Sequence, residues 1–149
     1  MMMGYKYKFE KILSIREREK EEALSIFNDS IRKFEEVAEK LYSLLKKKED
    51  LENYQSSRLR EGLSVQEIRH HQQFIANMEK AIEHYQKMVI NARNRMNFYQ
   101  DKLMEKNIEV KKYEKMKEKD LLQFIEETKS LENKQMDDIS IQFYMNRGN

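Results

Sequence analysis

The sequence predicts an all-α fold in which two long helices form an antiparallel coiled-coil hairpin. Proline is absent from all 149 residues, so no residue lacks the backbone donor that a helix interior needs. Of the three glycines, only Gly62 lies away from the chain ends, and glycine is the usual residue where a helix stops. On both sides of Gly62, apolar residues recur at alternating steps of four and three, which is the spacing of a coiled-coil seam.

The residues around Gly62 predict one tight turn between two helices. Gly62 can adopt the positive φ of a helix C-cap without a steric penalty. Ser64 and Glu67 have the spacing of a capping box, in which two orphaned backbone donors are satisfied at a helix start. Leu63 and Ile68 have the spacing of a hydrophobic staple across that cap. Three local signals therefore coincide at a single place.

An apolar seam runs along each predicted helix. Nine of thirteen positions are apolar in the first seam, and thirteen of seventeen, counting tyrosine, in the second. The first seam comprises Phe9, Leu13, Arg16, Lys20, Ala23, Phe27, Ser30, Phe34, Val37, Leu41, Leu44, Lys48 and Leu51. The second comprises Ile68, His71, Ile75, Met78, Ile82, Tyr85, Val89, Ala92, Met96, Tyr99, Leu103, Lys106, Val110, Tyr113, Lys117, Asp120 and Phe124. A short turn makes the helices antiparallel neighbours, so we expect the two seams to bury each other.

The predicted helices have unequal lengths. The first is expected at about residues 5–60, the turn at 61–64 and the second helix at about 65–132. At ~1.5 Å per residue, these helices would run roughly 80 Å and roughly 100 Å. The whole chain, residues 1–149, is expected to form this single hairpin domain.

The second helix is expected to extend beyond its partner. Folding back from the turn brings Phe9 near Tyr113, which leaves the chain after about Asp120 without a facing helix. The tail at 133–149 is then either frayed or kept for another molecule. Uncovered apolar residues there, including Met136 and Phe143, favour a binding role.

The chain offers no constellation typical of an enzyme, and we predict that it is not one. Cysteine is absent, and the sequence has no glycine-rich phosphate loop, no H-E-x-x-H and no G-x-S-x-G. His70 and His84 are too far apart on one helix to share a metal, and His71 is interpreted as a polar interruption of the seam. We therefore expect no cofactor, no metal and no small-molecule ligand.

Nucleic-acid binding is the alternative that the charge pattern raises. Residues 80–119 hold eleven Lys or Arg against six Asp or Glu, an excess that phosphate contacts would use. The charges interleave, however, so Glu and Lys neighbours three or four residues apart are expected to compensate one another. This pattern favours a solvated helix face and argues against a nucleic-acid partner, while an acidic protein surface stays open.

Four stretches of the sequence resemble the flagellar export protein FliJ family. They are "YKYKFEKILSIREREKEEAL", "HHQQFIANMEKAIEHYQ", "EKNIEVKKYEKM" and "MDDISIQFYM". The resemblance implies a component of the flagellar type III export apparatus that resembles the stalk of rotary ATPases. It implies association with the hexameric export ATPase, contact with the cytoplasmic part of the export gate, and help in cycling export chaperones. It also implies a cytoplasmic protein, peripheral at the inner membrane at the flagellar base; the sequence itself shows no secretory signal or membrane span.

The resemblance implies two sets of site residues. The candidates for binding the export gate are Tyr54, Gln72, Phe74, Met78, Ala81 and Tyr85. The candidates for contact with the ATPase ring are Tyr7, Phe9, Leu13, Leu121, Phe124 and Ile125. Met78 and Tyr85 are also seam positions, for which the competing interpretation is core packing.

A second hypothesis belongs to another functional class. A hairpin with uncovered apolar surface could be a generic coiled-coil scaffold or spacer that associates with itself. The two hypotheses differ in whether the chain is a monomer and whether it accompanies an ATPase.

Overall fold

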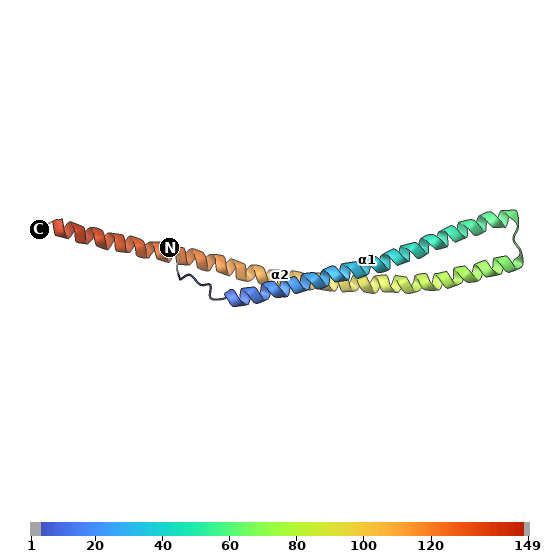
Figure 1. The fold of residues 1–149 in the computed structure, drawn as a ribbon, viewed down its shortest axis with the longest axis horizontal. Helices are drawn as coiled ribbons and strands as arrows, with labels where there is room; N and C mark the ends of the chain where they lie inside the picture. The colour runs from blue at the N-terminus through green and yellow to red at the C-terminus, as the bar shows by residue number, and fades with distance from the viewer. Residues whose placement is uncertain (1–3, 148–149) are drawn as a thin grey trace. The chain divides into compact units, whose positions relative to one another are not determined.

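Two long helices make up the described part of the chain, residues 4–147 of a computed structural model (Figure 1). Helix α1 spans Glu10–Glu61 and helix α2 spans Val65–Arg147. No strand occurs among the described residues. The prediction of an all-α helical hairpin is therefore confirmed.

The chain divides into two compact units, each built from a segment of both helices. The turn unit comprises Glu22–Met104 and includes the connection between the helices. The terminal unit comprises Met1–Glu21 and Glu105–Asn149, of which residues 4–21 and 105–147 are described.

The turn forms at Gly62, as the local signals predict. Gly62 has φ 92°, a left-handed conformation in which a side chain is strained. A Cβ added there would meet nothing within 4 Å, so glycine is favoured by backbone conformation and not by lack of space. Ser64 Oγ accepts a hydrogen bond from the Glu67 backbone N–H at 3.2 Å. This bond is the N-cap contact of the predicted capping box.

Within the turn unit, polar contacts join the two helices in antiparallel order. Lys48 Nζ lies 3.3 Å from Glu79 Oε1. One turn further along α1, the Leu51 carbonyl lies 3.2 Å from His71 Nε2. Moving forward on α1 thus moves the partner backward on α2. His71 occupies the seam as predicted, and its bond to a backbone carbonyl satisfies its polar ring there.

The terminal unit has the same antiparallel order and the most deeply buried side chains. Lys117 Nζ pairs with Glu10 Oε2 at 3.1 Å, and Lys106 Nζ pairs with Glu19 Oε2 at 3.3 Å. Hydrogen bonds from Arg16 and from Lys106 lower the pKa of the Glu19 carboxyl. The core of the unit consists of Tyr7, Leu13 and Val110, which are 7%, 4% and 2% exposed.

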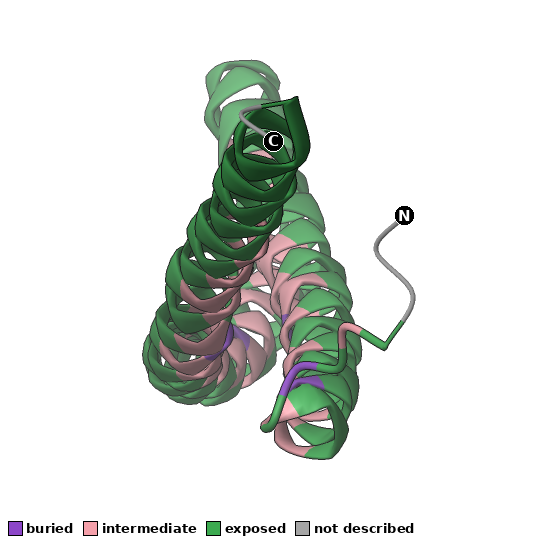
Figure 2. Ribbon diagram, turned by 90° about the vertical axis from the view of Figure 1, so that its left-hand side faces the viewer, coloured by how far each residue is buried: buried purple, intermediate pink, exposed green. Residues whose placement is uncertain are grey.

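The predicted seams coincide with the sheltered stripe of each helix. Every seam position named above is buried or half-buried, and Figure 2 shows the half-buried residues as stripes along the helices. Most of these side chains are half-buried because a two-helix seam is covered from one side only. A single helix pair has no second layer to complete the cover.

Residues 5–8 are not helical, although the first helix was expected to start at about residue 5. Instead, a non-helical segment, here called the strap (residues 4–9), leads into α1 at Glu10. It ends in a turn, in which the Glu10 N–H donates to the Tyr7 carbonyl at 3.2 Å. Tyr5 and Tyr7 are sheltered against α2, whereas Lys6 and Lys8 are exposed. Both tyrosines face α2, where their phenols bond to Asp120 and to the Tyr113 carbonyl.

The strap explains why cover on α2 ends later than the sequence analysis expects. Tyr5 of the strap contacts Asp120 and Phe124, which lie at and beyond the point where cover was expected to end. Half-buried residues consequently continue to Thr128, and every residue from 129 to 147 is exposed. This uncovered segment, residues 129–147, is here called the bare extension.

Helix α2 continues to Arg147, beyond the expected end at about residue 132. The segment 133–147 is helical, because it contains neither proline nor glycine that would interrupt it. Residues 148–149 of the predicted tail lie outside the described residues.

Candidate docking surfaces

The six candidates for gate binding all lie in the turn unit, with different exposure. Tyr54 and Phe74 are 54% and 53% exposed, and Gln72 is also exposed. Met78, Ala81 and Tyr85 are half-buried. The exposed aromatic rings are therefore the members of this set that present the most surface to another molecule.

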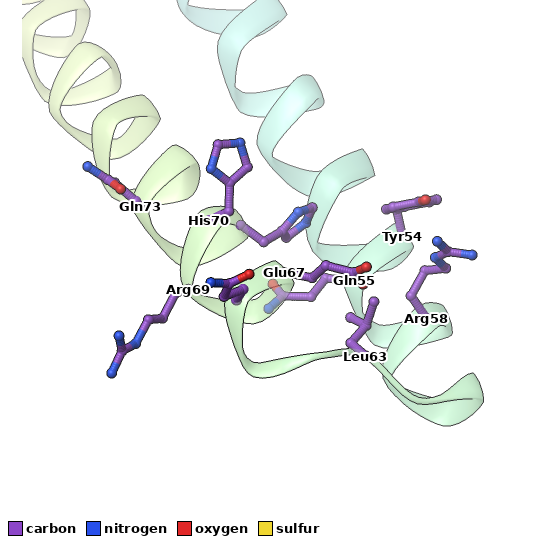
Figure 3. Close-up of a pocket in the computed structure, with 10 residues that line it drawn as sticks. Tyr54, Gln55, Arg58, Leu63, Glu67, Arg69, His70 and Gln73 are labelled. Atoms are coloured by element: carbon purple, nitrogen blue, oxygen red, sulfur yellow. The ribbon is translucent and has the colours of Figure 1, made fainter.

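A groove of about 640 Å³ lies beside the turn, where both helices and the connection contribute side chains. It is lined by Tyr54, Gln55, Arg58, Leu63, Gln66, Glu67, Arg69, His70, His71 and Gln73. Figure 3 shows Tyr54 and Arg58 side by side on α1, with the Arg58 guanidinium 5.6 Å from the centre of the Tyr54 ring. Of the six candidates, Tyr54 alone lines this groove among the described residues.

Sequence reasoning missed the polar lining of this groove. Arg58 lies near the end of α1 and Arg69 near the start of α2, and neither belongs to a motif. They line one groove because α2 folds back beside α1. The Tyr54 ring also lies 6.2 Å from the His71 ring, measured between centroids. The groove therefore lies next to the seam, to which His71 belongs.

The candidates for ATPase contact lie in the terminal unit and pack mainly against one another. Tyr7 and Leu13 belong to the core, so they are not available to another molecule while this packing holds. Phe9 is half-buried, with its ring centroid 6.2 Å from that of Tyr113. The Phe124 ring lies 5.2 Å from the Tyr5 ring. These residues hold the strap on α2.

Leu121 and Ile125 complete the candidate set for ATPase contact, and both are half-buried. They precede the point where cover on α2 ends. They connect the terminal core to the bare extension.

Hydrogen bonds from the two strap tyrosines reach α2. The Tyr5 phenol donates to Asp120 Oδ2 at 3.2 Å, and the Tyr7 phenol donates to the Tyr113 carbonyl at 3.1 Å. Desolvation raises the pKa of Tyr5, and the hydrogen bond to Asp120 raises it further. Desolvation also raises the pKa of Tyr7, followed by the charge of Asp120.

The bare extension carries large apolar side chains that no part of the described chain covers. They are Leu131, Met136, Ile139, Ile141, Phe143, Tyr144 and Met145, which are 56–80% exposed. Met136, Ile139 and Phe143 follow steps of three and four, so they share one helix face. Such a face on an otherwise charged helix is typical of a binding surface.

The chain was then compared with known proteins. A model of the family described as Flagellar FliJ protein matches residues 5–149. The chain belongs to the flagellar FliJ family. The Flagellar FliJ protein of Bacillus subtilis (strain 168) is 51% identical over 146 residues, which cover 98% of this chain and 99% of that relative. No solved structure matches the chain.

FliJ proteins are components of flagellar protein export, and this chain shares that assignment. The matched range includes all of the strap from Tyr5 onward and the whole bare extension. Both features therefore lie within the FliJ part of the chain.

Two further findings bound the chemistry of this FliJ chain. Within residues 4–147, no group of three or more His, Cys, Asp or Glu is placed to hold a metal ion. Across the same residues, none of the helices combines the length and apolar character that crossing a membrane requires.

Proposed function

We propose that this chain is a stalk-like element of the flagellar export apparatus that links three partners. The bare extension associates with the hexameric export ATPase, and the exposed rings of the turn unit dock on the export gate. The chain also helps to escort export chaperones. These contacts would occur in the cytoplasm, at the inner-membrane face of the flagellar base.

The bare extension is the observation that carries the proposal. A helix that leaves Ile139 and Phe143 each 62% exposed has not buried its apolar face. Fully burying such a side chain contributes about 1.5–3 kcal/mol, and a groove in a partner can accept a helix of this kind. The resemblance to a rotary ATPase stalk makes the ATPase ring the proposed acceptor.

Burial in the terminal unit narrows the set of residues that contact the ATPase. Tyr7 and Leu13 are assigned no direct contact with the ATPase, because they are buried in the terminal core. The direct contacts are assigned to the bare extension and to Ile125, which precedes it closely, whereas Phe9 packs on Tyr113. The exposed rings of the turn unit, Tyr54 and Phe74, are assigned to the gate.

Truncation after Thr128 tests the ATPase contact. The cut removes the bare extension and leaves Asp120 and Phe124, the contacts of the strap, intact. We expect the truncated chain to keep the melting temperature of the full chain and to lose stimulation of ATP hydrolysis. A matched control, Phe74→Ala in the full chain, should stimulate normally. Full stimulation by the truncated chain would contradict the proposal.

Self-association is the second candidate function, and the same apolar face favours it. A scaffold would cover Met136, Ile139 and Phe143 with a second copy of the chain. Light scattering distinguishes the two: the scaffold requires a dimer that becomes a monomer after truncation at Thr128. The export stalk requires a monomer before and after truncation.

A further inference from the structure

A run of lysines lies on the outward side of α2 in the terminal unit. Ile108, Lys111, Lys112, Lys115, Met116 and Lys119 line a shallow groove of about 500 Å³ there. These six residues are called the lysine face. Steps of three and four residues place them on one side of the helix. All four lysines are exposed.

The lysine face differs from the neighbouring lysines of α2 in how its charges are compensated. Lys106 and Lys117 point toward α1 and form ion pairs with Glu19 and Glu10. Within residues 4–147, none of the four lysines of the lysine face forms an ion pair within 4.0 Å. The compensation by neighbouring glutamates that the sequence pattern predicts is therefore not formed at this face. Lys111, Lys115 and Lys119 face solvent together, and the exposed Lys112 has its Nζ 5.7 Å from the centre of the Tyr113 ring.

Apolar side chains accompany these charges. Ile108 is 63% exposed and Met116 is 36% exposed, and Leu122 beyond the end of the face is 55% exposed. From Ile108 to Leu122 the helix advances roughly 21 Å at ~1.5 Å per residue. The exposed strip thus combines a row of cations with apolar side chains that a purely solvated face does not need.

The pattern argues against another helix as the occupant. The seam between α1 and α2 has apolar residues at most of its steps of three and four, as helix pairing requires. On the outward face, Lys112, Lys115 and Lys119 occupy the steps between Ile108 and Leu122. A second helix packed there would have to bury these ammonium groups, which is costly.

We propose that the lysine face binds the surface of an anionic lipid membrane. Lipid phosphates form a continuous negative layer, so each lysine finds a partner whatever its position along the helix. Ile108 and Met116 can enter the boundary between headgroups and acyl chains while the lysines stay at the phosphates. This inference goes beyond the export role, and it does not rest on contact with the ATPase or the gate.

Co-sedimentation of the full chain with lipid vesicles tests the inference. The probes are vesicles of phosphatidylcholine alone and vesicles that also contain phosphatidylglycerol. We expect binding to the mixed vesicles only, and weaker binding as added salt screens the charges. Because each lysine near an anionic surface contributes about fivefold, the triple variant Lys111→Gln, Lys115→Gln, Lys119→Gln should bind about 100-fold more weakly.

A matched control removes the same charge elsewhere. The triple variant Lys33→Gln, Lys46→Gln, Lys47→Gln changes three exposed lysines of the turn unit. Either triple variant lowers the net charge from +2 to −1, so net charge cannot explain a difference between them. We expect the control to bind mixed vesicles as the unchanged chain does, and both variants to keep its helical content.

Four outcomes would overturn the inference. The first is equal loss of binding in both triple variants, and the second is equal binding to both kinds of vesicle. The third is a lysine-face variant that still binds mixed vesicles but no longer binds the export ATPase, which would make the face a protein-docking surface. The fourth is tighter binding of the unchanged chain to a short DNA duplex than to mixed vesicles.

Discussion

The Tyr5 phenol donates a hydrogen bond to Asp120 Oδ2 at 3.2 Å, between residues 115 positions apart in the sequence. The Tyr5 ring also lies 5.2 Å from the Phe124 ring. These contacts set the outer limit of cover on α2, and the bare extension starts soon after them. The strap therefore determines how much of α2 is left for a partner.

The strap should detach when its buried ring is removed. Tyr7→Ala takes away the ring that is 7% exposed and the hydrogen bond to the Tyr113 carbonyl. We expect trypsin to cleave after Lys6 and Lys8 faster in this variant, because an attached strap does not fit a protease site. Tyr54→Ala is the control and should be cleaved like the unchanged chain. Equal cleavage of all three proteins would show that Tyr7 does not hold the strap.

Alkaline pH should release the strap as well. The folded-state pKa values of Tyr5 and Tyr7 are raised above 10.0, by desolvation first. The stability that these two groups contribute is therefore fully present below pH 10.0 and lost as pH rises through the raised values. In a titration followed by tyrosinate absorbance, we expect a late phase above pH 10.0 that belongs to Tyr5 and Tyr7. The double variant Tyr5→Phe, Tyr7→Phe should lack this late phase.

Replacing a leucine with alanine should have different effects before and after the point where cover on α2 ends. Leu13 is 4% exposed, so Leu13→Ala should lower the free energy of unfolding by about 2–5 kcal/mol. Leu131 is 62% exposed, so Leu131→Ala should change it by less than about 0.5 kcal/mol. Urea unfolding of the isolated chain measures both. A large loss in the Leu131 variant would mean that the extension is already covered.

The turn should tolerate loss of a cap better than loss of its residues. Ser64→Ala should cost about 1 kcal/mol in urea unfolding, because it removes the bond to the Glu67 N–H. Ser64→Pro should cost more, because proline restricts the residue before it. Deleting Gly62 and Leu63 should instead produce domain-swapped dimers, since a continuous helix exposes both seams. A deletion variant that stays monomeric with unchanged melting would show that these residues do not define the turn.

Binding to the export gate should depend on the exposed ring of Phe74. Phe74→Glu should weaken gate binding by more than about tenfold, because aromatic anchors dominate such interfaces. Helical content and melting should stay close to those of the unchanged chain, because the ring is 53% exposed. Ala81→Glu is a less selective test of docking, because Ala81 is half-buried and the new carboxylate would also disturb packing. Early melting of the Phe74 variant would assign this residue to the core.

The resemblance noted in the sequence was confirmed by the family match, whereas the roles of individual site residues stay predictions. The exposed fraction that distinguishes a docking residue from a core residue can be read only from the folded structure. Phe74 and Met78 are one helical turn apart and both apolar, yet only Phe74 is mainly exposed. Burial depends on the direction each side chain takes relative to the partner helix. That direction changes by ~100° per residue, so small errors in the assumed seam reverse the assignment.

The sequence alone determined the two helices, the position of their turn and the seams that face each other. These features follow from local chemistry: the absence of proline, a glycine that can adopt positive φ, a cap at Ser64 and the heptad period. The strap had a local signal as well, because "YKYKF" alternates apolar and charged residues with the period of an extended chain. Because this stretch is short and is followed by strong helix formers, the predicted helix was extended over it.

Only the tertiary structure decided where cover on α2 ends and which of its lysines are paired. Both depend on residues distant in sequence: Tyr5 must reach Asp120, and Glu10 must reach Lys117. Local spacing places Lys115 and Lys117 two residues apart in the same charged run, with equal access to glutamates. The packing of α1 against one side of α2 gives Lys117 a carboxylate partner and leaves Lys115 facing solvent, because only one face of a helix can meet its neighbour.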